Sequence, residues 1–259
     1  MGKVPVSVVV ITKNEEANIA DCLKSAAWAD EIIVVDDNSS DDTVAIAKKF
    51  TDKVFSRKMD VEGIHRNYAY SLAKNDWALS LDADERISQE LKTELEELFK
   101  KPLEHKAYTI PIKTYIGRRW IRYAGWYPAP KVRLFDKGRF KYEEVEVHPR
   151  VFIDGSCGHL NNDIVHYSYG DFHDFFESLN NQTTQEAKKW FKEKRKIGPF
   201  KMLRKFADRF LKAYILKKGY KDGFLGFVVS CAGGLYQFLS YAKYWEMLQS
   251  QKSKVKSQN

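Results

Sequence analysis

The first 84 residues alternate between short runs of apolar, β-branched residues and segments with the spacing of an amphipathic helix. Continuous apolar runs are typical of strands that are buried on both faces of a parallel sheet. The predicted strands are Val4–Ile11, Ile32–Val35, Lys53–Ser56 and Trp77–Leu81. Because strands that alternate with helices form βαβ units, the pattern predicts an α/β fold with an open, mostly parallel sheet covered on both faces.

Two of these strands end in clusters of acidic residues. The carboxylates are Asp36 and Asp37 after the second strand and Asp82, Asp84 and Glu85 after the fourth. Since the carboxyl ends of parallel strands meet at one edge of a sheet, we expect both clusters to face one cleft. Carboxylates in such a cleft can hold a divalent cation against a phosphate-bearing substrate. Either cluster alone could instead be a solvated turn or the acidic first turn of a helix.

Beyond residue 100 the sequence predicts shorter strands and then a helical tail. The strands are expected at Ala107–Ile112, Lys131–Phe135, Phe140–Val147 and Ile164–Tyr167. Residues 171–248 show helical spacing. We therefore expect an α/β domain over residues 1–170 and a helical, basic extension over residues 171–259.

Charge is distributed unevenly along the 259 residues, whose formal net charge is +8. Residues 187–221 carry fourteen Lys and Arg against Glu193 and Asp208, whereas residues 1–186 carry 25 basic and 31 acidic side chains. A basic tail on an acidic body indicates a polyanionic partner for the tail. Over Phe200–Lys218 the basic residues alternate with Phe, Leu and Tyr at helical spacing, which favours an anionic membrane surface over nucleic acid.

The segment that follows has no charged side chain for twenty residues, from Gly223 to Ala242. It is long enough to span a bilayer, but its glycines, serines and glutamine favour an interfacial helix or one buried against its basic neighbour. The three cysteines, Cys22, Cys157 and Cys231, have no spacing typical of a disulfide framework or a zinc site. The start of the sequence also shows no charged leader of the kind that precedes export. We therefore expect a protein of the cytoplasm.

Four ordered motifs resemble those of the family 2 glycosyltransferases. They are VVVITKNEE at residues 8–16, VVDDNSSD at 34–41, Arg66–Asn67 and LDAD at 81–84. Later motifs resemble the branch that includes bacterial lipopolysaccharide core glucosyltransferases; they are VRLF at 132–135, VHP at 147–149, IVHY at 164–167, FLKAY at 210–214 and GYKDG at 219–223. The resemblance implies a GT-A (Rossmann-like) fold and inverting transfer from a nucleotide-sugar. It further implies an acceptor at the cytoplasmic face of the inner membrane, with residues 171–259 contacting that membrane or the acceptor.

By the same resemblance, the carboxyl edge of the sheet would hold the donor. Asp37 would accept a hydrogen bond from the base N–H of uridine, with Asp36 close behind it, and Arg66 would lie beside the base or the diphosphate. The residues that would line the base and ribose pocket are Thr12, Asn14 and Glu15.

A divalent cation, Mg²⁺ or Mn²⁺, is expected to hold the diphosphate, because a cation stabilises the charge that develops on a departing UDP. Asp84 is the first predicted ligand, and Asp82 either ligates through water or holds the ribose. Related GT-A enzymes place a late histidine on the metal, which implies His166 as a third ligand. A single histidine in an apolar strand is nevertheless more often a core residue.

Inversion requires a base that removes a proton from the acceptor hydroxyl. If Phe140–Val147 is a strand, alternation places Glu144, Glu146 and His148 on one face. We expect Glu144 or Glu146 to be the base, and His148 to be a further candidate for catalysis or acceptor binding. The branch commonly has a glutamate after this histidine, whereas the present chain has Pro149.

Two further features are candidate contacts to the acceptor. Arg133 could bind a phosphate, because a guanidinium group matches its oxygens. The aromatic pair Trp126–Tyr127 could stack on a sugar, with core packing as the alternative.

Other enzyme classes fit the sequence less well. A sugar nucleotidyltransferase would need a glycine-rich loop after the first strand, where this chain has Thr12–Glu15. Neither a dinucleotide-binding nor a Walker motif occurs. The sequence thus predicts a metal-dependent hexosyltransferase that moves glucose from UDP-glucose to a lipopolysaccharide inner core or related lipid-linked acceptor. A polyprenyl-phosphate or protein acceptor remains an alternative, as does a non-enzymatic, basic module that binds membrane or nucleic acid.

Overall fold

The computed structural model describes residues 2–145, 150–196 and 198–256, without the side chains of 252–256. It divides the chain into two compact units. The sheet unit comprises Met1–Lys113 and Ala129–His166, and the helical unit comprises Thr114–Pro128 and Tyr167–Asn259. Residues 114–128, which the sequence placed in the first domain, thus cluster with the C-terminal helices.

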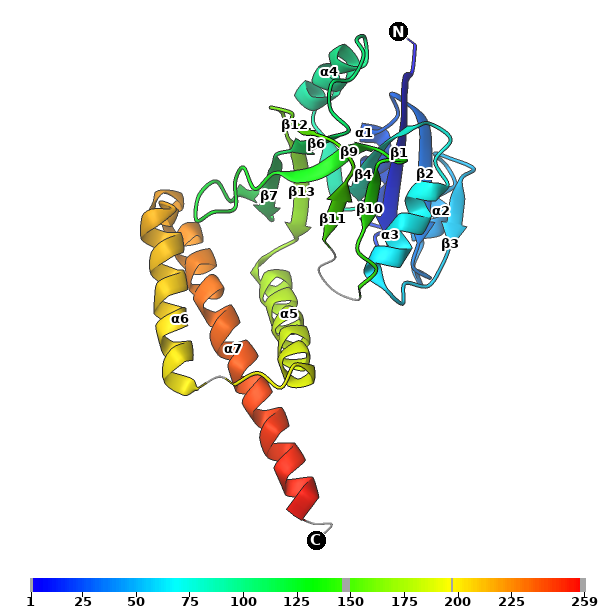
Figure 1. Ribbon diagram of the computed structural model, residues 1–259. Helices are drawn as coiled ribbons and strands as arrows, with labels where there is room; N and C mark the ends of the chain where they lie inside the picture. Colours follow the sequence, from blue (N-terminus) through cyan, green and yellow to red (C-terminus); the bar gives the residue numbers. More distant parts are fainter. Residues whose placement is uncertain (1, 146–149, 197, 257–259) are drawn as a thin grey trace. The chain divides into compact units, whose positions relative to one another are not determined.

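A seven-stranded sheet forms the centre of the sheet unit (Figure 1). In spatial order its strands are β12 (Cys157–His159), β6 (Ala107–Ile110), β9 (Lys131–Asp136), β4 (Trp77–Asp82), β1 (Val4–Thr12), β2 (Ala29–Asp36) and β3 (Val54–Ser56). All neighbours are parallel except β9, which is antiparallel to both β4 and β6. The mostly parallel α/β sheet that the sequence predicted is therefore confirmed.

Successive side chains of the central strands pack alternately into the two layers that cover the sheet. Val8 and Val10 of β1 pack with α1 (Ile19–Ser25), α2 (Thr43–Ala47) and α4 (Gln89–Leu98). Val9 and its neighbours pack instead against α3 (Glu62–Ser71), on the opposite face (Figure 1). Because both faces of β1 are covered, most of its side chains are apolar. Ser7 is a buried exception, and its hydroxyl donates a hydrogen bond to Glu31.

The register of the central strands brings their carboxyl ends level. Thr12 pairs with Asp36 across β1 and β2, and Ile11 pairs with Asp82 across β1 and β4. After a turn at residues 83–84 the chain forms a further short strand, β5 (Glu85–Ile87), which is antiparallel to β13 (Ile164–Tyr169). In this pairing Glu85 lies opposite His166. The acidic segment is thus partly strand, rather than wholly an exposed tip.

One predicted strand is shorter than expected. The sequence predicted Phe140–Val147, but β10 ends at Tyr142 and pairs with β11 (Val151–Ile153). Glu144 therefore follows the strand, so strand alternation does not decide which way its side chain points. Glu146, His148 and Pro149 lie outside the described residues.

The helical unit contains three long helices and a short hairpin. The helices are α5 (Phe172–Lys192), α6 (Pro199–Leu211) and α7 (Gly223–Lys256). The hairpin joins β7 (Ile112–Ile116), of which Thr114 to Ile116 belong to this unit, to β8 (Arg119–Trp120). A π-helical turn (Lys212–Leu216) and a 3₁₀ turn (Gly219–Asp222) connect α6 to α7. Asp222 accepts hydrogen bonds from the backbone of Arg122 and Tyr123, which explains why residues 114–128 belong to this unit.

Candidate functional site

A cavity of about 300 Å³ lies at the carboxyl ends of β1, β2 and β4. Its lining residues are Ile11, Thr12, Lys13, Glu15, Asp37, Met59, Asp82, Ala83, Asp84 and His166. Asp37 and Asp84, from the two acidic clusters, therefore face the same volume. The shared cleft that the sequence predicted is present in the structure.

Asp37 is a buried carboxylate held at one end of this cavity. Its Oδ2 accepts a hydrogen bond from Lys13 Nζ at 2.8 Å, and its Oδ1 accepts one from the Met59 backbone N–H at 2.7 Å. Burial alone would raise the pKa of Asp37, but the Lys13 ammonium and the Met59 N–H outweigh it and lower that pKa. Asp37 is thus ionised and can accept a further hydrogen bond from a ligand.

The lowered pKa of Asp37 predicts a pH-dependent contribution to stability. Because the native state favours the ionised form, the contribution is complete above the pKa of an unfolded aspartate, about 3.9, and is lost as pH falls through the lower folded value. At pH 7 we expect Asp37→Asn to reduce the free energy of unfolding by about 1–2 kcal/mol. Urea unfolding of both proteins at pH 7 and near pH 3 measures this. A difference that stays constant with pH would contradict the assignment.

The loops around Asp37 are joined by side chains that the sequence assigned to the donor. Asp36 accepts hydrogen bonds from both the backbone N–H and the hydroxyl of Ser39. Asn14 has a positive φ of 52°, donates its backbone N–H to Ser39 Oγ and accepts from the Ser40 N–H. Of the predicted nucleoside-binding residues, Asp36 and Asn14 thus shape the loops, whereas Thr12 and Glu15 line the cavity.

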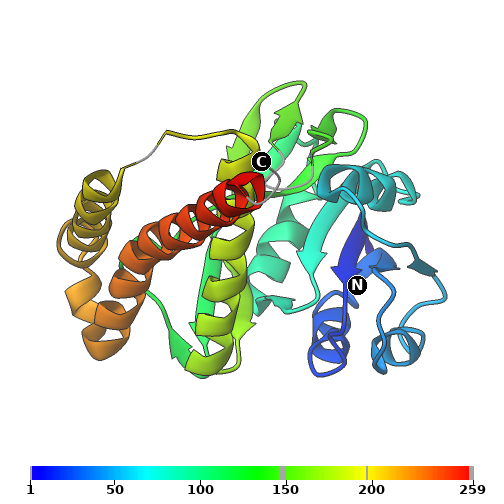
Figure 2. The ribbon, with the colours of Figure 1, turned by 90° about the horizontal axis from the view of Figure 1, so that it is seen from below.

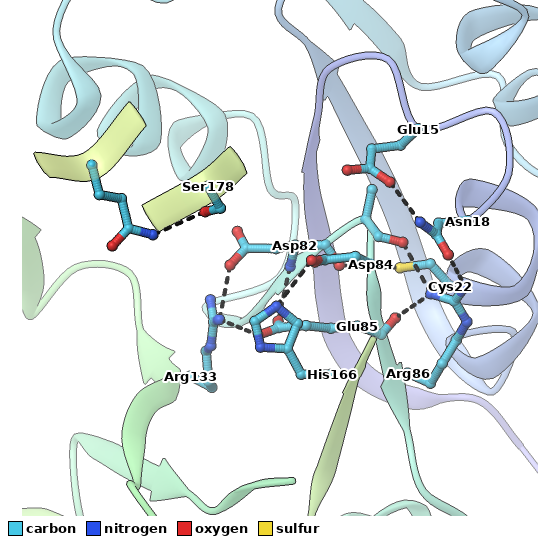
Figure 3. Close-up of polar contacts among 12 residues, drawn as sticks. Glu15, Asn18, Cys22, Asp82, Asp84, Glu85, Arg86, Arg133, His166 and Ser178 are labelled. Carbon is cyan, nitrogen blue, oxygen red and sulfur yellow. Dashed lines mark hydrogen bonds and ion pairs between the residues drawn. The ribbon is translucent and has the colours of Figure 1, made fainter. Parts of the chain in front are cut away.

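Asp84 and His166 line the same cavity and contact each other (Figure 3). Asp84 Oδ2 lies 2.9 Å from His166 Nε2, because β5 and β13 pair immediately beside both residues. Burial alone would lower the pKa of His166, but the hydrogen bond to Asp84 and the charges of Asp84 and Glu85 raise it. His166 is therefore a polar residue of the cavity rather than a core histidine.

The donor set at this point is compatible with a divalent cation that is shared with a substrate. Among the described residues no group of three or more His, Cys, Asp or Glu is arranged to hold a metal. Asp84 and His166 supply two adjacent ligand atoms, one carboxylate oxygen and one imidazole nitrogen, that face the cavity. Mg²⁺ is usually bound by one or two carboxylates together with substrate phosphates, so these residues fit the predicted metal.

Asp82, the other predicted metal ligand, is held by two arginines. Its Oδ2 accepts from Arg133 Nη2 at 2.9 Å, and its Oδ1 lies 3.4 Å from both terminal nitrogens of Arg66. Burial alone would raise the pKa of Asp82, but Arg133 and Arg66 hold it well below its usual range. Both oxygens of Asp82 are thus engaged by cationic side chains, and the residue also lines the first cavity.

Glu85 is a partner that the sequence pattern did not identify. It is fully buried, accepts the backbone N–H of Asp82 at 2.9 Å and pairs with Arg133 Nη2 (Figure 3). It therefore anchors both the turn that carries Asp84 and the guanidinium group that holds Asp82. Its position as the third carboxylate of the cluster was the available signal, but nothing in the sequence distinguished a buried anchor from an exposed acid.

A second cavity, of about 280 Å³, shares Asp82 with the first. It is lined by Glu62, Arg66, Asp82, Lys131, Val132, Arg133 and Tyr142, so that three cationic side chains face two carboxylates. Arg133 is only 3% exposed, and its Nε has no hydrogen-bond partner among the described residues. Because an unpaired buried donor is costly, this cavity is suited to an anionic ligand that can satisfy it.

The segment that carries Glu144 lies against the first turn of α3. Gly63 donates its N–H to the Val145 carbonyl at 3.4 Å, and a Cβ at Gly63 would lie 1.8 Å from the Glu143 carbonyl oxygen. The same turn of α3 carries Glu62, and Arg66 follows one turn later; both line the second cavity. Glu144 itself is half-exposed and pairs with Lys141 at 2.8 Å. Burial raises the pKa of the neighbouring Tyr142 to about 12, which makes that phenol a poor base at neutral pH.

Two other features prove less suited to the predicted chemistry. Trp126 packs with the apolar cluster around Phe175 in the helical unit, which favours the packing alternative for this aromatic residue.

A larger cavity of about 670 Å³ lies beside α3 and the β10–β11 hairpin. Its one acidic lining residue, Asp154, is ion-paired with Arg139, so this cavity has no free carboxylate for a metal.

Comparison with known proteins gives consistent matches over most of the chain. The family model described as glycosyl transferase family 2 matches residues 7–211. An uncharacterised glycosyltransferase of Rickettsia typhi is 32% identical, over 98% of this chain and 91% of its own length. The lipopolysaccharide core biosynthesis glycosyltransferase LpsC of Rhizobium meliloti is 24% identical, over 94% of this chain and 93% of its own length. The solved structure of Staphylococcus aureus TarS residues 1–349 aligns with a TM-score of 0.46 and 16% identity, over 93% of this chain and 91% of that one.

Proposed function

The chain belongs to glycosyl transferase family 2, and on that premise we propose that it transfers glucose from UDP-glucose, with inversion, to a phosphorylated, lipid-linked acceptor such as a lipopolysaccharide inner core. The observation that carries this proposal is the single cavity that Asp37 and Asp84 share at the carboxyl edge of the sheet. The similarity to LpsC supports the choice of acceptor. The proposed location is the cytoplasmic face of the inner membrane, with the protein bound peripherally.

The nucleoside is proposed to bind at the Asp37 end of the first cavity. An ionised Asp37 is an acceptor suited to the ring N–H of uracil, and it would repel a base that presents a carbonyl at that point. Thr12 lines the same cavity, and its buried hydroxyl has no hydrogen-bond partner among the described residues. A ligand carbonyl or ribose hydroxyl would satisfy it, so a bound nucleoside would supply the hydrogen-bond partner that this hydroxyl needs.

The diphosphate is proposed to lie at the other end, beside Asp84 and His166. A divalent cation held there would offset the negative charge that develops on the leaving UDP. Asp84 and His166 would hold that cation, and Asp82, fixed by Arg66 and Arg133, would support the turn or contact the ribose. Removing the cation with a chelator should therefore weaken the binding of UDP more than the binding of uridine.

The acceptor is proposed to bind in the second cavity. Arg66, Lys131 and Arg133 form a cationic lining that suits a phosphate group, and Asp82 separates this cavity from the donor. A hydroxyl beside the bound phosphate would then approach the sugar from the side away from the diphosphate, as inversion requires. Glu144 and Glu146 remain the proposed alternatives for the base, with His148 as an acceptor contact.

Replacing the two glutamates separately should identify the base. We expect either Glu144→Gln or Glu146→Gln to reduce kcat by about 10²–10⁴-fold, because a neutral amide cannot accept the proton. Donor binding should stay unchanged in both variants, as measured by calorimetry with UDP. Glu143→Gln serves as the matched control, since Glu143 is occupied by Arg150. If all three variants kept full turnover, the base would have to lie elsewhere in the chain.

A nucleotide-sugar binding panel tests the proposed function as a whole. UDP-, GDP- and dTDP-sugars are titrated into the protein with and without Mn²⁺, and the binding heats are compared. We expect UDP-glucose to bind most tightly, and only weakly after the metal is removed. The same titration on Asp37→Asn should show weaker binding of UDP-glucose, because a neutral amide is a poorer acceptor than a carboxylate for the ring N–H of uracil. A protein that bound no nucleotide-sugar, or preferred a guanosine donor, would refute the proposal.

A further inference from the structure

Residues 200–227, which comprise almost all of α6, its connection to α7 and the first residues of α7, carry more than half of the exposed large apolar side chains among the described residues. Fifteen large hydrophobic side chains are exposed among the described residues, and eight of them fall within residues 200–227. These eight are Phe200, Leu203, Leu211, Ile215, Leu216, Tyr220, Phe224 and Phe227. Phe200 is 88% exposed, and Leu216 and Phe224 are each 74% exposed. Soluble proteins seldom leave such a patch without a partner.

The apolar surface of α6 is wider than its packing on α7 requires. Met202 is buried, and Phe206 contacts α7 so closely that a Cβ at Gly234 would lie 2.9 Å from its ring. Phe200, Leu203 and Leu211 recur at spacings of three and eight residues on a different side of the helix and remain exposed. Within the helical unit, α6 lies on the side of α7 away from α5 (Figure 2). The apolar sector of α6 thus has an inner half that packs on α7 and an outer half without a partner.

The exposed apolar side chains are accompanied by a strong positive charge. Residues 200–227 contain eight Lys and Arg against Asp208 and Asp222, a net charge of +6. Asp222 is already bound to the backbone of residues 122 and 123. Partial burial and the nearby charges of Lys201, Arg195 and Arg209 lower the pKa of Lys205, as expected where cations crowd without enough counter-charge.

Helix α7 is packed as an internal helix of its unit. Residues 219–251 form a helix long and apolar enough to cross a bilayer, but 44% of the apolar window is buried against the protein. A Cβ at Gly226 would lie 1.8 Å from the Gly219 carbonyl oxygen, and Tyr244 packs with Trp190 of α5. Crossing a membrane would require α7 to leave these contacts. The α6–α7 connection is therefore better suited to lying in the interface than to spanning it.

We propose that residues 200–227 form a membrane-insertion segment, in which the exposed apolar side chains enter the acyl boundary of an anionic bilayer and the flanking lysines and arginines bind its phosphate groups. This deepens the peripheral membrane location on which it rests. A second copy of the chain is a poor occupant, because a symmetric interface would bring two patches of +6 charge together. Nucleic acid would pair with the cations but leave the apolar side chains exposed.

Flotation with lipid vesicles tests the insertion. The full-length protein should float with vesicles of phosphatidylglycerol and phosphatidylcholine at about 0.1 M salt, and not with phosphatidylcholine alone. Two variants each remove one contribution: Phe200→Gln, Leu203→Gln, Leu216→Gln and Phe224→Gln together, and Lys201→Gln, Arg204→Gln, Lys205→Gln, Arg209→Gln and Lys212→Gln together. Each should lower the bound fraction at limiting lipid by about tenfold or more.

Matched controls change the same chemistry outside the segment. Phe152→Gln with Phe238→Gln removes two exposed aromatic residues, and Lys24→Gln, Lys48→Gln, Lys49→Gln, Lys100→Gln and Lys101→Gln removes five exposed lysines of the sheet unit. Both controls should float like the unchanged protein. Circular dichroism confirms that each variant is folded, which its exposed positions allow.

Each alternative has its own result. If the apolar variant bound vesicles fully, charge alone would attach the protein. If only detergent released the protein from vesicles, α7 would span the bilayer. Either result would overturn the proposal. A dimer that the apolar variant dissociates, without loss of flotation, would assign the patch to self-association. UDP-glucose binding is measured on the same samples. Flotation without nucleotide binding would refute the proposed function alone, and nucleotide binding without flotation would refute the insertion alone.

Discussion

Asp84→Ala is expected to reduce sugar transfer by about 10³-fold, because it removes the carboxylate proposed to hold the cation against the diphosphate. The Mn²⁺-dependent part of UDP binding should be lost at the same time, while binding of uridine, which lacks phosphates, should be unchanged. Steady-state transfer assays and titrations of UDP with and without Mn²⁺ measure both. The free energy of unfolding should change little, because the contact that the substitution removes is the single hydrogen bond to His166, at 2.9 Å.

A control substitution of an aspartate on the surface shows whether the effect is specific to Asp84. Asp60→Ala removes an exposed aspartate that pairs with Lys58 at 3.6 Å, and it should leave transfer and UDP binding intact. His166→Ala should reduce metal-dependent binding less than Asp84→Ala does, because one anionic ligand remains. Near-normal transfer by Asp84→Ala would remove the basis for the metal assignment.

Arg133→Leu is expected to destabilise the fold by about 3–5 kcal/mol, the largest stability effect that we foresee for one side chain. The Arg133 guanidinium is 3% exposed and joins Asp82 to the fully buried Glu85. Without it, Glu85 is a buried carboxylate with no cation in contact, and Asp82 retains only Arg66, at 3.4 Å. Urea unfolding at pH 7 measures the loss, with the slope of the transition checked for two-state behaviour.

A double substitution separates the buried charge from simple loss of packing. Arg133→Leu combined with Glu85→Leu should recover much of the stability, because replacing both members of a buried ion pair leaves no unpaired charge. Arg139→Leu is the matched surface control: its partner Asp154 is exposed, so the cost should be below about 1 kcal/mol. If Arg133→Leu cost no more than Arg139→Leu, the network around Asp82 would contribute little to the fold.

The position of the two acidic clusters could be predicted from the local sequence pattern. The mostly apolar, β-branched run of β1 and the alternating helices indicate a parallel sheet, and a parallel sheet places all strand carboxyl ends at one edge. It followed that Asp37 and Asp84 share a cleft, although 46 residues separate them in the chain. The amphipathic spacing of α6 likewise indicated a helix with a basic face.

Other properties of the site depend on pairings between distant residues. The strand β10 ends at Tyr142, where the Asn67 side chain bonds both the N–H and the carbonyl of that residue. The next residue, Glu143, still donates its backbone N–H to the Arg150 carbonyl at 2.8 Å, but β10 itself ends at Tyr142, whereas the sequence extended it to Val147. The Glu144 assignment therefore has no support from strand alternation, and Glu146 and His148 stay predictions.

By itself the sequence determined the order of the first four strands of the sheet and of the helices between them, the edge at which the acidic residues gather and the basic character of the tail. These follow from the period of apolar side chains along the chain, which is a local property. The sequence did not indicate the short strands β5, β8, β11 and β12. Only the tertiary structure decided that Glu85 is a buried anchor, that Asp82 is paired with Arg66 and Arg133, and that half of the apolar face of α6 has no partner. The exposure and partner of a side chain depend on which remote segment packs against it, and the residue types in a local stretch are compatible with several such arrangements.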